Sequence, residues 1–176
     1  ATAPETKDND FTWKDFQARN NNELVAIFGN FINRVLVLTN KYYDGIVPHP
    51  NTFSEIDTQT LEKVKAFPAS LSKSIERYRF REASQELMNL ARLGNKYLAD
   101  EEPWKVIKTD PERVQTIMYV ALQISAALAV VSEPFLPASS QKLKTMLQLA
   151  PHSWEAVQTG NPLLQPDHNI GTAALL

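Results

Sequence analysis

Two polar side chains on one expected helix have types and spacing suited to recognising the polar edge of a nucleotide base. Asn30 and Arg34 stand four residues apart, so on an α-helix their side chains lie one turn from each other and reach the same object. Asparagine presents paired donor and acceptor groups, and arginine presents a planar fork of donors that matches a base edge or a phosphate. A solvated edge of an amphipathic helix is the plainer alternative for this pair.

A tryptophan that follows a proline supplies a third candidate. Pro103 restricts the residue before it and changes the direction of the chain, which displays the ring of Trp104. An aromatic face combined with edge hydrogen bonds is what recognition of an unstacked RNA base requires. A buried corner anchor is the alternative interpretation of Trp104, and the exposure of its ring separates the two.

No catalytic arrangement can be assembled from the remaining residues. The chain has no cysteine, and its histidines, His49, His152 and His168, are scattered, so we expect no metal site. Its 5 glycines form neither of the common phosphate-binding motifs. Glu101 and Glu102 are adjacent and point in different directions on a helix, so we expect a solvated helix end rather than an acid–base pair.

The size, charge and hydropathy of the chain limit its partners. Its 176 residues fit one domain with one core. The formal net charge of −2 argues against DNA binding and against any nucleic-acid contact that is not local. The longest apolar run, residues 117–131, is shorter than the roughly 20 residues that a membrane span needs. We therefore expect a core helix there and no membrane partner.

Helical periodicity predicts an all-α fold, a bundle of four to five long helices with short loops. A first helix is expected from about Asn22 to Gly45, with an N-cap among Asn20, Asn21 and Asn22 and a stop at Asp44-Gly45. Further helices are expected over residues 58–67, 80–99, 111–131 and 138–149. The helix over residues 111–131 is expected to begin behind Thr109 or Asp110, which stand ahead of Pro111.

Three local features refine this bundle. Pro68 is expected to interrupt the second helix, because proline removes a donor and clashes with the preceding turn. Gly94 is expected to let a neighbouring backbone come close. A segment with Phe11, Trp13 and Phe16 is expected to dock the chain at the start of the first helix.

The apolar positions that recur at helical spacing predict one shared core and one domain. The domain is expected to comprise a leading segment over residues 1–20, the helical bundle over 21–149 and a mostly extended tail over 150–176. The absent initiator methionine and the apolar last residues lead us to expect a piece of a longer protein. The positions expected in the core are Leu24, Phe28, Phe31, Leu87, Leu90, Ile117, Ile124 and Leu128.

Several separated motifs resemble the anticodon-binding domain of methionyl-tRNA synthetase, a class I aminoacyl-tRNA synthetase. They are DNDFTWKDF, GNFINR, NKYYDG, NKYLADEEPW, EPFLP and HNIGTAALL, and together they span nearly the whole chain. The resemblance implies a helical bundle that follows a catalytic Rossmann-fold domain and reads the CAU anticodon of methionine tRNAs, initiator and elongator. The two adenylate-forming signatures of that family are absent, so this piece should not aminoacylate.

The resemblance also implies roles for particular residues. Trp104 would stack on the first anticodon base, cytosine, while Asn30 and Arg34 would hydrogen-bond to it. Ala26, one turn before Asn30, stands where many members carry another asparagine, which leaves the number of base contacts open. Residues expected near the RNA are Pro103, Lys105 and Lys108.

The resemblance further implies the partners and the location. They are methionine tRNA and the catalytic domain of the same chain, in the cytoplasm. No cofactor is expected in this piece, since ATP is used by the catalytic domain of the longer enzyme, a methionine–tRNA ligase. Two alternatives stay open: the anticodon domain of another class I synthetase, for which the combination of Asn30, Arg34 and Trp104 is the discriminator, and a helical protein-interaction module without an RNA role.

Overall fold

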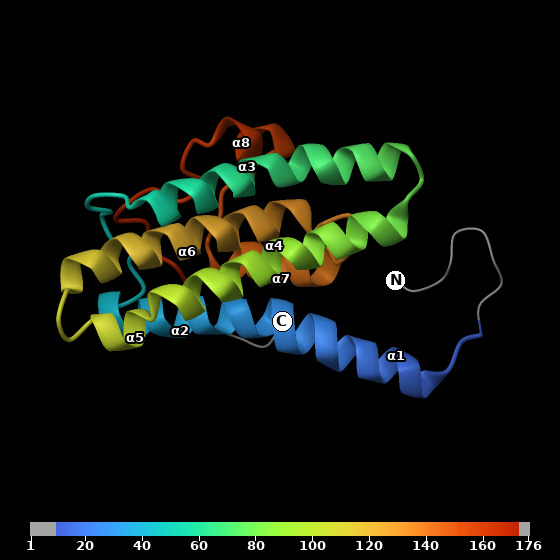
Figure 1. Ribbon diagram of the computed structural model, residues 1–176, viewed down its shortest axis with the longest axis horizontal. Coiled ribbons are helices and arrows are strands. Elements are labelled where there is room, and N and C mark those ends of the chain that lie inside the picture. Colours follow the sequence, from blue (N-terminus) through green and yellow to red (C-terminus); the bar gives the residue numbers. More distant parts are fainter. Residues whose placement is uncertain (1–9, 173–176) are drawn as a thin grey trace.

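The structure, a computed structural model that describes residues 10–172, is built of helices packed around one central helix (Figure 1). The helices are α1 (Trp13–Arg19), η1 (Asn20–Gly29), α2 (Asn30–Tyr43), α3 (Glu55–Glu76), α4 (Phe80–Glu101), α5 (Pro103–Val106), α6 (Pro111–Val131), α7 (Pro137–Met146) and α8 (Trp154–Thr159). Helix α6 contacts α2, α3, α4, α5, α7 and α8. The predicted all-α bundle is confirmed.

The core lies where the helical periodicity predicted it. All the expected core positions except Leu24 are buried, and Leu24 is partly buried against the same core. Helix α6 is long and apolar enough to cross a membrane, but 94% of that stretch is buried inside the protein. It is therefore a core helix, as its sequence predicted. Gln123 and Ser125, which lie inside its apolar run, are satisfied internally, since Gln123 donates to the Leu164 carbonyl and Ser125 to the Ala121 carbonyl.

The first long helix begins earlier than predicted and is continuous through three segments. Thr12 is its N-cap, in an extended conformation, and the side-chain oxygen of Thr12 accepts from the Asp15 amide at 3.2 Å. The expected cap among Asn20, Asn21 and Asn22 is wrong, because α1 passes directly into η1, a π-type stretch, and then into α2. The helix ends as predicted, with Asp44 and Gly45 both at positive φ.

Helix α3 runs through Pro68, so the expected interruption is wrong. The helix starts at Glu55 behind a capping box in which the Asp57 amide donates to Ser54 Oγ and the Ser54 amide donates to Asp57 Oδ2. Pro68 removes one helical hydrogen bond, but its ring is buried on the side of α3 that packs against the bundle. Burial of that ring offsets the lost bond.

Gly94 makes room for a side chain and not, as predicted, for a backbone. A Cβ at this position would lie 2.5 Å from Phe31 Cζ, which is far closer than two carbon atoms can approach. The Phe31 ring of α2 is fully buried against the bare backbone of α4. The lack of a side chain at position 94 therefore sets the separation of α2 and α4 at this point.

The tail is held to the core by Gln123. Besides its bond to the Leu164 carbonyl, Gln123 accepts from the Leu163 amide at 2.8 Å. The Ile170 amide donates to the Gly45 carbonyl at 2.7 Å, which ties the tail to the end of α2. Over residues 150–172 the tail contains α8 and otherwise consists of turns and irregular segments.

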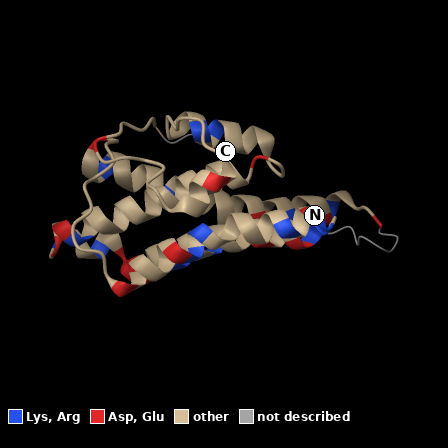
Figure 2. Cartoon of the chain, turned by 90° about the horizontal axis from the view of Figure 1, so that it is seen from above, with Lys and Arg blue, Asp and Glu red and all other residues tan. Residues whose placement is uncertain are grey.

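Charges of both signs are interspersed along the bundle. Figure 2 shows Lys and Arg alternating with Asp and Glu on the long helices rather than gathering on one face of that view. This distribution agrees with the small net charge and with a nucleic-acid contact confined to a local site.

Candidate functional site

The corner between α4 and α6 positions Trp104. Helix α4 ends at Glu101, and its C-cap is Glu102, whose φ of 42° and ψ of 54° place it in the left-handed region. Pro103 occupies the first position of α5, where its fixed φ and missing N–H suit the start of a helix. The Lys105 amide closes the turn by donating to the Glu102 carbonyl at 2.8 Å. The Trp104 ring is partly buried, with part of its surface packed on the core and part left to solvent.

Helix α2 places Arg34 against this ring. The Arg34 guanidinium carbon lies 5.1 Å from the centroid of the Trp104 ring, within the range of a cation–π contact. Within residues 10–172 the guanidinium has no hydrogen-bond or ion-pair partner, so its donors remain available. Asn30 is exposed one turn earlier on the same helix. The structure thus brings Arg34 and Trp104 together from distant parts of the sequence, with Asn30 beside them on α2.

The other residues expected near the RNA surround the corner in different ways. Pro103 is buried, so its ring supports the corner from below. Lys105 is exposed and forms an ion pair with Glu102 at 2.7 Å. Lys108 is exposed on the segment between α5 and α6.

A buried ionic network lies beneath the corner. Asp57 at the start of α3 is fully buried, and both of its carboxylate oxygens accept from the Arg113 guanidinium of α6. Tyr97 of α4 donates to Asp57 Oδ1 at 2.6 Å. Burial alone raises the pKa of Asp57, but hydrogen bonds from Arg113 and Tyr97 outweigh it and hold that pKa below its ordinary value. The same bonds to Asp57 raise the pKa of Arg113 above its ordinary value.

Glu101 belongs to this network, which corrects the expectation of a solvated helix end. Its side chain retains 14% exposure, and Arg113 Nη2 donates to Glu101 Oε2 at 2.7 Å. Sequence reasoning missed the network because its members come from three helices. Its local signals were the spacing of Ser54 and Asp57, which fits a capping box, and the position of Arg113 in the first turn behind Pro111.

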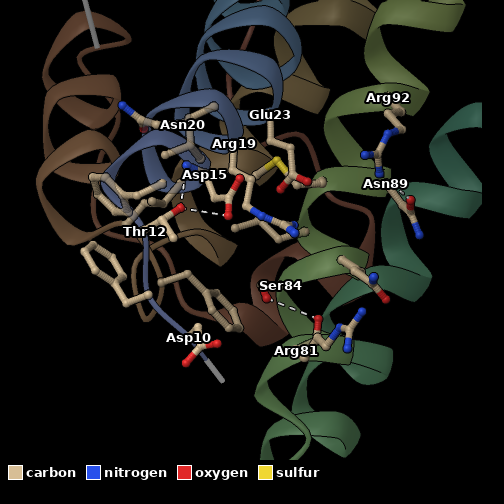
Figure 3. A pocket seen from close by; sticks show the side chains of 18 residues that line it. Asp10, Thr12, Asp15, Arg19, Asn20, Glu23, Arg81, Ser84, Asn89 and Arg92 are labelled. Atoms are coloured by element: carbon tan, nitrogen blue, oxygen red, sulfur yellow. Dashed lines mark hydrogen bonds between the residues drawn. The ribbon is translucent and has the colours of Figure 1, made fainter. Parts of the chain in front are cut away.

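A cavity of about 660 Å³ lies away from the corner, between the start of the first helix and α4 (Figure 3). Its wall mixes acidic and basic side chains, among them Asp15, Glu23, Arg19 and Arg92. Figure 3 shows Asp15 bonded to Thr12, so this carboxylate serves the helix cap. Cavity size therefore does not identify the site here, and the paired Trp104 and Arg34 remain the candidate.

The aromatic residues that were expected to dock the chain at the start of the first helix are largely exposed. Phe11, Trp13 and Phe16 contact one another with ring centroids 5.2–6.0 Å apart. Their exposed fractions are 64%, 77% and 54%, and α1 has no buried residue. This is an uncovered aromatic cluster at the end of the long first helix.

The all-helical bundle agrees with the anticodon-binding class that the sequence motifs suggest. Residues 47–172 match the family described as the anticodon binding domain of methionyl tRNA ligase. Residues 1–36 match the class I tRNA synthetase family for methionine. The chain belongs to the family of anticodon-binding domains of methionyl-tRNA ligases, which decides between methionine and the other class I candidates.

Individual relatives agree with this assignment. The chain is 68% identical, over its full length, to a methionine–tRNA ligase of Christiangramia forsetii and covers 26% of that protein. It is 74% identical, over 85% of its length, to a methionine–tRNA ligase of Flavobacterium johnsoniae and covers 21% of it. The chain thus spans about a quarter of the length of these relatives.

A solved structure shares the fold. The free form of a Mycobacterium tuberculosis methionyl-tRNA synthetase superimposes with a TM-score of 0.87 at 22% identity, over 96% of this chain and 35% of that one. At this identity the likeness supports the fold alone.

Proposed function

We propose that this domain reads the CAU anticodon of methionine tRNAs, initiator and elongator, at the corner formed by α2 and α5. Trp104 stacks on the first anticodon base, cytosine, and Arg34 and Asn30 hydrogen-bond to the edge of that base. The observation that carries the proposal is the contact between the Arg34 guanidinium and the Trp104 ring, because it aligns a donor fork with a stacking face.

The charge distribution supports a local mode of recognition. Stacking and edge hydrogen bonds need few phosphate contacts, so a domain with a net charge of −2 can bind an RNA loop through one small site. Arg34 is suited to this role because its donors have no other partner within the described residues. Lys105 and Lys108 are exposed and follow Trp104 within four residues of the sequence, so in this proposal they supply positive charge for the flanking phosphates.

Binding of a CAU anticodon stem-loop, measured by fluorescence anisotropy, tests the proposal. Trp104→Ala should weaken binding by about 1–3 kcal/mol, the usual range for one base–aromatic stack, and Trp104→Phe should retain part of the affinity. Arg34→Ala should cost a comparable amount, but chiefly for loops with cytosine at the first position, because a lost edge hydrogen bond reduces discrimination.

Trp154→Ala is the matched control, since Trp154 is also partly buried and lies on α8, outside the site. Each variant is first checked for folding by its thermal midpoint. If Trp104→Ala binds the loop as tightly as Trp154→Ala does, the tryptophan is a core anchor and the site must lie elsewhere.

We further propose that the domain works within an ATP-dependent methionine–tRNA ligase and carries no cofactor itself. The exposed cluster of Phe11, Trp13 and Phe16 would then pack against the catalytic domain of the same chain. Its position supports this, since these residues fall within residues 1–36, which match the class I synthetase family. The cytoplasm, where tRNA is charged, is the proposed location.

A further inference from the structure

The segment that carries Trp104 is fixed at both ends by one ionic network. Glu101 is the last residue of α4, before the corner, and Arg113 lies in the first turn of α6, after it. Their side chains meet at 2.7 Å, and Arg113 is in turn paired with the fully buried Asp57 of α3. The two ends of the segment are therefore held to each other and to a third helix.

The backbone directly after Glu101 needs such support. Glu102 has φ of 42°, and a residue with a side chain adopts this conformation only where its surroundings enforce it. The side chain of Glu102 is paired with Lys105, but that pair is exposed and contributes little. Glu101, at 14% exposure, is the adjacent residue with a largely desolvated ionic contact.

The composition of the network points to geometry rather than to overall stability. Buried ion pairs add little to stability compared with well-packed apolar residues, and in some proteins they instead fix the relative position of the groups that they join. Here the groups joined are the start of α3, the end of α4 and the start of α6.

We infer that Glu101, held by Arg113 and Asp57, is a positioning residue for anticodon binding: it fixes the backbone at Glu102 so that the Trp104 ring lies where a base can stack. The inference rests on the proposed function of Trp104 and deepens it. Glu101 touches no RNA in this scheme and acts through Trp104.

Three substitutions at position 101 separate geometry from charge. Glu101→Ala removes the bond to Arg113 and leaves the Arg113–Asp57 pair intact. Glu101→Gln keeps an oxygen that can accept from Arg113 but loses the charge. Glu101→Asp keeps the charge but shortens the side chain, so the carboxylate no longer reaches Arg113. The control is Asp100→Ala, which removes a neighbouring negative charge that is exposed and paired with Lys96.

Affinity for the CAU stem-loop is measured for each variant of the 176-residue chain. Glu101→Ala and Glu101→Asp should each bind on the order of tenfold more weakly, within the range seen for residues that act without touching the ligand. Glu101→Gln and Asp100→Ala should bind like the unaltered chain. Simple charge repulsion predicts the opposite order, because removal of a negative charge would strengthen RNA binding.

A double-mutant cycle shows whether Glu101 acts through Trp104. In a Trp104→Ala background, Glu101→Ala should change the affinity by less than about twofold, because the residue that it positions is gone. An equal loss in both backgrounds, or a Glu101→Asp variant that binds normally, would overturn the positioning role.

The outcome also distinguishes this inference from the proposed function. If Trp104→Ala weakens binding and the position 101 variants do not, the anticodon site stands and only the positioning role is wrong. If Trp104→Ala leaves binding unchanged, both are wrong.

Discussion

Replacing Arg113 with methionine should destabilise the bundle by leaving a carboxylate buried without its charged partner. Asp57 is fully buried, and the substitution removes both bonds that it receives from the guanidinium, leaving those from Tyr97 and from the Ser54 amide. Breaking a buried pair in this way costs about 3–5 kcal/mol. The Arg113 side chain is 20% exposed, so we expect a loss at the lower end, about 3 kcal/mol.

The loss should depend on pH in a defined direction. In the unaltered chain the pKa of Asp57 is lowered, so this group contributes stability above its unfolded pKa of about 4, and the contribution is lost as the pH falls through the lower folded value. Without Arg113, burial dominates and raises the folded pKa of Asp57 above its unfolded value. The variant is then penalised at neutral pH and relieved as the pH falls through that raised pKa. The stability difference between the two proteins should therefore shrink toward acid.

Urea denaturation at pH 7 and at pH 4.5 measures this difference. At neutral pH the thermal midpoint should also fall by roughly 6–12 °C, as expected for a loss of about 3 kcal/mol in a chain of this size. The control is the double variant Arg113→Met, Asp57→Asn, in which no carboxylate remains to titrate, so the acid-dependent relief should disappear. A loss below about 1 kcal/mol, or one independent of pH, would show that Asp57 is not held as a buried carboxylate.

Two further predictions concern the packing around Gly94 and the expectation that this chain does not form methionyl-adenylate. Gly94→Ala should destabilise the fold by about 1–3 kcal/mol in urea denaturation, because the new methyl group collides with the buried ring of Phe31; relief by a second substitution, Phe31→Leu, is the check on that cause. The pure chain, mixed with ATP, methionine and tRNA, should form no methionyl-adenylate, and detectable adenylate would contradict a purely tRNA-binding domain.

The bundle could be predicted from the sequence because the residue patterns that specify its helices are local and periodic. Positions such as Phe28, Leu90 and Ile124 fall on three-and-four spacings and are buried as expected. The start of α6 could also be predicted from neighbouring residues. Asp110 stands directly ahead of Pro111, and its side chain accepts from the Arg113 amide. Each of these signals operates within one or two helical turns.

The errors arose where a distant contact overrides a local preference. Pro68 weakens a helix by itself, but it is retained inside α3 because its ring is buried. Glu101 looks like a solvated helix end until Arg113 and Asp57 are placed beside it by other helices. The contact between Arg34 and Trp104 could not be derived from spacing either, because no local spacing relates residues on separate helices; their residue types grouped them, and the family resemblance suggested their roles.

The first helix shows how a change of helical type affects the site. The predicted stripe assumed uniform α periodicity from Leu24 onward, whereas the chain winds as a π-type helix until Gly29 and as an α-helix from Asn30. A π-type stretch places more residues in each turn, so an α-based stripe drawn across the junction drifts from the buried face. Leu24 lies early in the π-type stretch and is only partly buried, whereas Phe28 near the end of that stretch and Phe31 beyond it are buried.

The junction itself is supported from α4. Asn95 donates to the Ile27 carbonyl at 2.8 Å, within the π-type stretch. Gly94, the residue directly before Asn95 on α4, receives the Phe31 ring, so two adjacent residues of α4 fix the last part of η1 and the first part of α2. Asn30 begins α2 at this junction and Arg34 follows one turn later, in contact with Trp104. Helix α4 therefore positions both halves of the candidate site. Gly94 and Asn95 hold the helix that carries Asn30 and Arg34. The end of α4 fixes the corner that carries Trp104.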